Sequence, residues 1–168
     1  LPWYGFNTDI ELYNNTTADE KSSIARYSMT ATNGQLNLAN GPYNELMGGI
    51  ERANLAIRGI RQYGNPAGDA QMAELLGEAL TARALLYTEL LKAYGEVPAR
   101  FAPIDAETIY LNKADKDLIY KQLIADLEEA FQYMNWPGKS AATATTDRPS
   151  LAFAKGLYAR LCLMASGY

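Results

Sequence analysis

The stretch that decides the fold runs from Gly77 to Pro98 and reads GEALTARALLYTELLKAYGEVP. Apolar residues recur along it and just before it at helical spacing, at Leu76, Ala79, Leu86, Leu90 and Ala93. Arg83 interrupts this apolar stripe. Gly95 suits the C-terminal cap of a helix, and the proline three positions later cannot continue one. The stretch therefore predicts a long, mostly buried helix with one charged residue on its apolar face.

Three further apolar stripes of period 3.6, separated by glycine and proline breaks, predict three more long helices. The four predicted helices cover about residues 43–60, 70–94, 114–134 and 150–164. Pro42 suits the first turn of the first helix, and Asp115 is a candidate cap for the third. No segment has the pattern of a strand ladder. We expect an all-α domain over residues 43–168, built as two antiparallel helix pairs that share one core.

Residues 1–42 form a separate N-terminal loop region in this prediction. Aromatic, asparagine and aspartate residues dominate the first 17 positions, as in irregular segments. One short helix is expected over residues 18–32, with Asp19 or Thr17 as its cap and Ile24 and Tyr27 turned inward. Asn33 and Gly34 should end it, and residues 35–41 read as a polar loop.

The composition excludes several classes of function. The net charge is −4, which argues against nucleic acid as a partner. The absence of histidine rules out histidine acid–base chemistry and histidine metal sites, so neither a metal nor a cofactor is predicted. Cys162 is the only cysteine and is expected to be a buried, inert thiol. The apolar, aromatic opening LPWYGF and the apolar closing helix are typical of a piece of a longer chain.

The stretch from Gly77 to Pro98 resembles the signature helix of the SusD/RagB family. The matching residues are Glu78–Ala79, Arg83–Ala84, Tyr94–Gly95 and Val97–Pro98. Thr81–Ala82 replaces the aromatic that the family usually has before the arginine, and the C-terminal part of the family fold is absent. Further matches in the same order lie on the helices before and after it, at Tyr43, Ile50, Ala53–Asn54, Tyr120, Ile124, Asp126–Leu127, Ala130, Arg148, Ser150, Ala154, Leu157 and Arg160–Leu161.

The resemblance implies helix pairs like those of tetratricopeptide repeats, arranged as an α–α superhelix. It also implies a lipid-anchored, surface-exposed protein of a Bacteroidetes outer membrane, with an anchor that this chain does not contain. Such a protein captures oligosaccharides, or sometimes peptides, for a TonB-dependent transporter of the SusC type. The alternative is a helical interaction scaffold that has no small-molecule ligand of its own.

Candidate ligand-binding residues gather in the N-terminal region, at Trp3, Tyr4, Asn7, Asp9, Asn37 and Asn40. Sugar recognition needs flat apolar faces for C–H groups and amides or carboxylates for hydroxyls, and the WYGFNTD segment offers both. Loops also carry binding residues more often than helices do. In the competing interpretation, Trp3 only anchors a core.

Three polar residues on apolar helix faces, Glu78, Arg83 and Asn54, are interpreted as buried structural groups. An unpaired guanidinium is very costly to bury, so Arg83 should pair with Glu78, Glu51 or Glu89 or with backbone carbonyls. Catalysis is not predicted. Glu128–Glu129 reads as a solvated face, and a hydrolase would need two carboxylates facing each other across a cleft.

Overall fold

Two short helices, α1 (Glu20–Ala25) and α2 (Gly34–Asn37), open the computed structural model, which describes residues 19–167. The described residues divide into two units, with the boundary between Glu45 and Leu46. Asp19 caps α1 by accepting hydrogen bonds from the amides of Lys21 and Ser22. Asn33 caps α2 and also donates to the Glu20 carbonyl at 2.9 Å, which ties the two helices together.

The N-terminal region differs from the sequence prediction in three respects. The helix expected over residues 18–32 ends at Ala25, because Tyr27 takes a positive φ of 55° that no α-helix accommodates. Tyr27 was expected to turn inward, but its side chain is 80% exposed. Within the segment 35–41, predicted to be a loop, α2 forms one turn around its asparagine cap.

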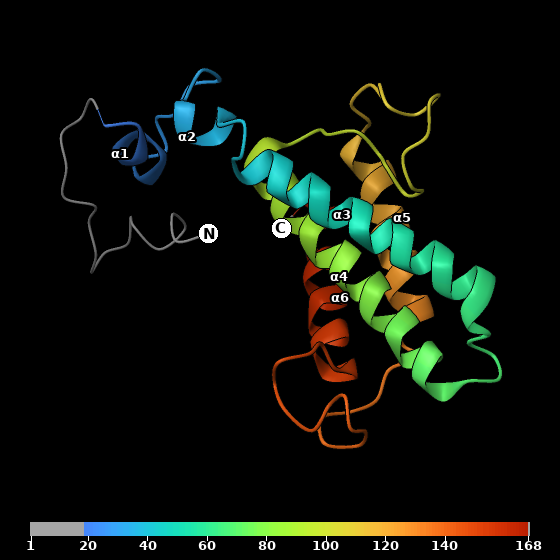
Figure 1. Ribbon diagram of the computed structural model, residues 1–168. Helices are drawn as coiled ribbons and strands as arrows, with labels where there is room; N and C mark the ends of the chain where they lie inside the picture. The colour runs from blue at the N-terminus through green and yellow to red at the C-terminus, as the bar shows by residue number, and fades with distance from the viewer. Residues whose placement is uncertain (1–18, 168) are drawn as a thin grey trace. The chain divides into compact units, whose positions relative to one another are not determined.

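The second unit contains the long helices, except for the first turn of α3. These are α3 (Pro42–Gly59), which continues into the π-helical turn η2 (Ile60–Gly64), α4 (Ala70–Tyr94), α5 (Lys116–Ala130) and α6 (Leu151–Ala165). Figure 1 shows α3 and α4 side by side in opposite directions, with α5 and α6 forming the second antiparallel pair. The only β-bridge among residues 19–167 is the isolated one between Pro98 and Lys113. The all-α prediction is therefore confirmed.

The core lies around α4, which packs against α5, α6 and η2. Its inner face and the facing residues of α3, α5 and α6 are almost fully buried, at Ile50, Leu76, Leu80, Ala84, Tyr87, Leu90, Ile119, Leu123, Leu127 and Leu161. Gly77 lets α4 approach the end of α5, since a Cβ there would lie 2.5 Å from Cγ of Met134. The apolar stripes read from the sequence thus form one continuous core.

The helix ends follow from local chemistry. Asp69 caps α4 through the amides of Gln71 and Met72. Asp115 caps α5 through the amide of Asp117, as predicted. Gly95 ends α4 with a φ of 68°, where its amide donates to the Leu91 carbonyl. The third predicted helix is shorter at its C-terminal end, since α5 ends at Ala130 with Phe131 as its cap.

Hydrogen bonds within the connection from α4 to α5, residues 95–115, hold its backbone in place. The amide of Ala114 donates to the Val97 carbonyl at 3.0 Å. The buried guanidinium of Arg100 donates to the carbonyls of Thr108 at 2.6 Å and Ile109 at 3.1 Å. This long connection is therefore well anchored. Between residues 19 and 167, no helix is both long and apolar enough to span a membrane.

Candidate functional site

The ligand-binding residues expected from the sequence fall in two places. Trp3, Tyr4, Asn7 and Asp9 lie outside the described residues. Asn37 and Asn40 lie in the first unit and are both exposed. The Asn37 amide donates to the carbonyls of Ala31 at 2.7 Å and Asn33 at 2.9 Å, so it stabilises the turn around α2.

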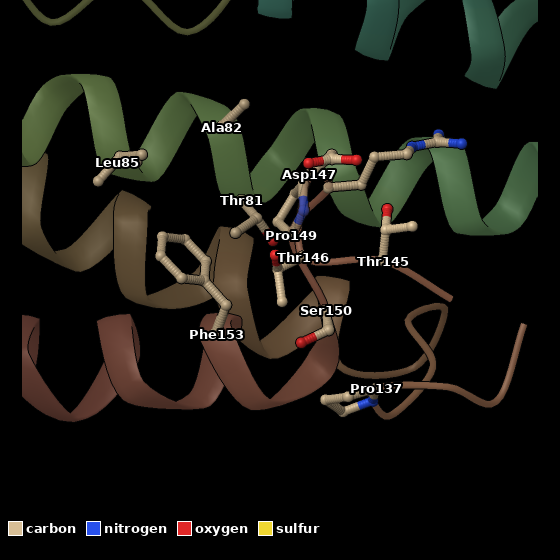
Figure 2. A pocket seen from close by; sticks show the side chains of 11 residues that line it. Thr81, Ala82, Leu85, Pro137, Thr145, Thr146, Asp147, Pro149, Ser150 and Phe153 are labelled. Atoms are coloured by element: carbon tan, nitrogen blue, oxygen red, sulfur yellow. The ribbon is translucent and has the colours of Figure 1, made fainter. Parts of the chain in front are cut away.

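A cleft lies in the second unit, between α4, the start of α6 and the connection 136–150 that joins α5 to α6 (Figure 2). It has two adjoining hollows, of about 410 and 640 Å³, that share Thr145, Asp147 and Arg148 as lining residues. Sites for small molecules typically have about 300–1,000 Å³. Sequence reasoning missed this cleft, because the flexible-looking segment KSAATATTD gives no motif and its folding against α4 depends on tertiary contacts.

The wall of the cleft is held by hydrogen bonds between the connection and α4. Glu74 accepts from the Ser140 hydroxyl at 2.6 Å and from the Asn135 amide at 3.2 Å. Glu78, expected to be buried, has a side chain that is 14% exposed and accepts a hydrogen bond from Nη2 of Arg148 at 2.5 Å. This hydrogen bond raises the pKa of Arg148, so the guanidinium stays charged. The connection is therefore fixed to α4 at two points.

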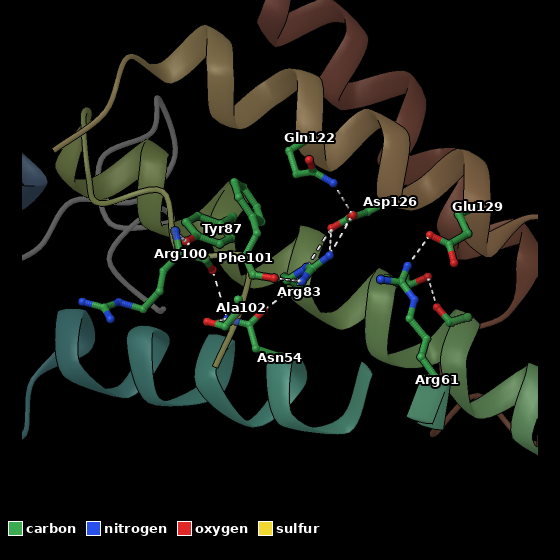
Figure 3. Close-up of polar contacts among 12 residues, drawn as sticks. Asn54, Arg61, Arg83, Tyr87, Arg100, Phe101, Ala102, Gln122, Asp126 and Glu129 are labelled. Carbon is green, nitrogen blue, oxygen red and sulfur yellow. Dashed lines mark hydrogen bonds and ion pairs between the residues drawn. The ribbon is translucent and has the colours of Figure 1, made fainter. Parts of the chain in front are cut away.

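A second polar cluster is centred on Arg83 and lies inside the helical core (Figure 3). Nε and Nη2 of Arg83 donate to the two carboxylate oxygens of Asp126, each at 2.8 Å. Nη1 donates to Oδ1 of Asn54 at 2.8 Å and to the Phe101 carbonyl at 3.0 Å. Arg83 is 3% exposed and Asp126 is 2% exposed. The cluster joins α3, α4, α5 and the 95–115 connection.

Asn54 and Tyr87 extend this cluster to the backbone of the connection. The Asn54 amide donates to the carbonyls of Arg100 at 3.0 Å and Ala102 at 3.2 Å. The Tyr87 hydroxyl accepts from the Arg100 amide at 2.6 Å and lies within bonding distance of the Pro98 and Arg100 carbonyls. These contacts satisfy backbone groups that would otherwise be buried without partners, which is a structural task.

Arg83 is buried and bonded to a carboxylate and a backbone carbonyl as expected, but the glutamates named as its partners were wrong. Glu78 and Glu89 are five and six residues away on the same helix, so both point away from the Arg83 face. Glu51 instead accepts from the amide of Ile104. The actual partner, Asp126, lies among the buried apolar residues of α5. Its position, an acidic residue on an apolar helix face, is the sequence signal that could have identified it.

The Arg83 cluster serves to hold the packed helices together. Burial raises the pKa of the Asp126 carboxyl, and the Arg83 charge and the hydrogen bond from Gln122 offset part of that shift. The hydrogen bonds of the buried Arg83 guanidinium all go to protein groups, which fits a structural role. Across residues 19–167, no group of three or more acidic or cysteine side chains is arranged to hold a metal ion.

The chain is similar to known proteins over most of its length. A family model described as SusD-like, starch-binding and associating with the outer membrane matches residues 6–163. A comparison with curated proteins found no match.

Three solved structures share the fold. A laminarin-binding SusD-like protein is 22% identical, with a TM-score of 0.72 over 88% of this chain and 31% of its own. A SusD superfamily protein of Bacteroides thetaiotaomicron is 19% identical, with a TM-score of 0.75 over 92% and 35%. A surface glycan-binding protein of Bacteroides fluxus is 23% identical, with a TM-score of 0.73 over 88% and 30%. The chain spans about a third of the length of these relatives.

Proposed function

Because this chain belongs to the family of SusD-like starch-binding proteins that associate with the outer membrane, we propose that it captures oligosaccharides for a TonB-dependent transporter of the SusC type. The observation that carries the proposal is the family match over residues 6–163. Two structural neighbours, a laminarin-binding SusD-like protein and a surface glycan-binding protein, support a glycan as the ligand. The role is binding, with no chemical step.

The proposed location is the outer face of a Bacteroidetes outer membrane, where a lipid anchor holds the protein. The family description names an association with the outer membrane. Structural neighbours from Bacteroides species support the same group of bacteria. A binding protein that feeds a transporter must reach glycans outside the cell, which favours the outer leaflet.

The residues proposed to touch the glycan are Trp3, Tyr4, Asn7 and Asp9, with Asn37 and Asn40 as further amides. The aromatic rings would stack on the C–H faces of sugar rings, and the polar groups would bond hydroxyls. Asp9 is expected to contribute most among the polar groups, because a charged acceptor makes stronger hydrogen bonds than a neutral one.

The test is the double change Trp3→Ala with Asp9→Ala in the full-length protein, titrated with maltohexaose and laminarihexaose. Binding should weaken while the unfolding temperature stays within about 1 °C of wild type, since loop substitutions away from a core cost little. Unchanged binding would show that the glycan site lies elsewhere in the protein. The unfolding measurement has to accompany the titration, so that a loss of fold is not taken for a loss of binding.

The second candidate function, an interaction scaffold, is favoured by one feature of the 95–115 connection. Ile104, Ile109 and Tyr110 are exposed there, and Tyr110 is 91% exposed although Arg100 anchors the backbone next to it. Exposed apolar side chains on a fixed backbone are typical of protein-binding surfaces. Co-purification with the transporter, combined with glycan titration, separates glycan capture from scaffolding. A scaffold would co-purify with the transporter but would have no affinity for glycan.

A further inference from the structure

The cleft between α4, α6 and the connection 136–150 combines an apolar hollow with a polar one. Leu85, Pro137 and Phe153 line the smaller hollow. Glu74, Asn135 and Ser140 line the larger one, and Thr145, Asp147 and Arg148 lie where the two meet. A ligand that fills both must therefore have an apolar face and a polar edge within one compact unit.

Phe153 supplies an aromatic surface that the core does not use. Its side chain lies in the first turn of α6 and is 44% exposed, and Figure 2 shows the ring rising from α6 on the side of Thr81 and Leu85. The face of an aromatic ring carries partial negative charge, so it attracts polarised C–H groups as well as apolar ones. Phe153 is thus suited to stack against a flat ring that carries such C–H groups.

Polar groups next to this ring keep unused hydrogen-bonding capacity. The Ser150 hydroxyl makes no capping bond to α6, although Ser150 occupies the N-cap position. The exposed carboxylate of Asp147 has no hydrogen-bond or ion-pair partner among residues 19–167. One guanidinium nitrogen of Arg148, Nη2, binds Glu78. A polar ligand in the cleft would meet a donor, an acceptor and a hydroxyl within one segment of chain.

The charges at the cleft select among polar ligands. Glu74 and Asp147 line the cleft with two carboxylates, and the charge of the one lining guanidinium, Arg148, is offset by its ion pair with Glu78. The excess of negative charge disfavours phosphates and acidic sugars, because like charges brought close together in a partly desolvated site repel each other. A neutral ligand with several hydroxyls fits these charges best.

We propose that this cleft binds one neutral sugar residue of an oligosaccharide, with the sugar ring stacked on Phe153 and its hydroxyls bonded to Asp147, Arg148 and Ser150. The inference rests on the proposed function, glycan capture, and concerns a site within the second unit alone.

The test compares variants of the full-length protein by calorimetric titration with maltohexaose and laminarihexaose. Phe153→Ala should weaken binding about 3- to 10-fold, the range for one aromatic contact, and Phe153→Tyr should restore it. Asp147→Asn should also weaken binding, since it removes a charged acceptor. The matched control is Leu163→Ala, which changes a 57% exposed apolar residue of the same helix outside the cleft and should leave affinity unchanged.

The outcomes distinguish this inference from the function on which it rests. If wild type binds a glycan and both Phe153→Ala and Asp147→Asn keep the wild-type affinity, the cleft is no sugar site and glycan capture stands. If wild type binds neither oligosaccharide, both proposals are overturned. A structure of the full-length protein in which another part of its own chain fills the cleft would also overturn the inference.

Discussion

Replacing Arg83 by methionine tests how the core is held together. Methionine keeps much of the volume of the side chain but removes four hydrogen bonds: two to Asp126, one to Asn54 and one to the Phe101 carbonyl. Asp126 would then be buried with only the Gln122 amide as a partner. The variant therefore leaves a charge without compensation inside the core.

The expected loss of unfolding free energy is about 3–5 kcal/mol, the range for breaking one partner of a buried ion pair. This is a large share of the roughly 5–15 kcal/mol that stabilises a typical protein. Removing both charges with Arg83→Met and Asp126→Leu should recover most of the loss, because no uncompensated charge remains.

The loss of stability in Arg83→Met should also depend on pH in a definite direction. Burial already raises the pKa of Asp126, and loss of Arg83 removes an interaction that lowers it. A buried carboxylate with a raised pKa destabilises the folded state. This destabilisation disappears as the pH falls through that pKa, because the carboxyl group becomes neutral. The stability gap between wild type and Arg83→Met should therefore narrow between pH 7 and pH 5.

The assay is urea unfolding followed by circular dichroism for wild type, both single variants and the double variant. A loss below about 1 kcal/mol for Arg83→Met would refute the argument, as would a double variant no more stable than the single ones. A gap that widens toward pH 5 would show that Asp126 is not the group responsible.

Three further changes test other parts of the structure. Tyr87→Phe should cost about 1–3 kcal/mol in urea unfolding, since the buried Arg100 amide loses its acceptor; a neutral result would mean that water replaces the hydroxyl. Gly95→Ala should cost about 1–3 kcal/mol, because φ of 68° with ψ of −127° strains any residue with a Cβ, and an unchanged midpoint would show that the turn relaxes. The hydrogen bond to Glu128 raises the pKa of Tyr158 to about 12, so ultraviolet titration of wild type minus Tyr158→Phe should show a late-titrating tyrosine that Glu128→Gln shifts toward 10; an ordinary midpoint in wild type would contradict this.

The helices were predictable because each depends on signals local to the sequence. The apolar stripe and Gly95 define α4, and the acidic cap at Asp115 defines the start of α5. The N-terminal region was predicted less well. A short helix with few core contacts ends where one residue, Tyr27, takes a positive φ, and composition alone does not mark that position.

The polar sites were harder to predict because they depend on which helix faces meet. The sequence marked Arg83 as a charge on an apolar stripe, but only the packing of α4 against α5 selects Asp126 over the nearby glutamates. The cleft is a similar case, since its wall is a segment of small polar residues that hydrogen bonds to Glu74 and Glu78 fix in place.

The most direct test of glycan capture is native affinity electrophoresis of the full-length protein in gels that contain starch or laminarin, with reducing ends assayed in parallel. The account predicts slower migration in at least one of these gels, with no release of reducing sugar from the polysaccharide. Migration equal to that of a non-binding control in both gels, or steady release of reducing sugar, would contradict it.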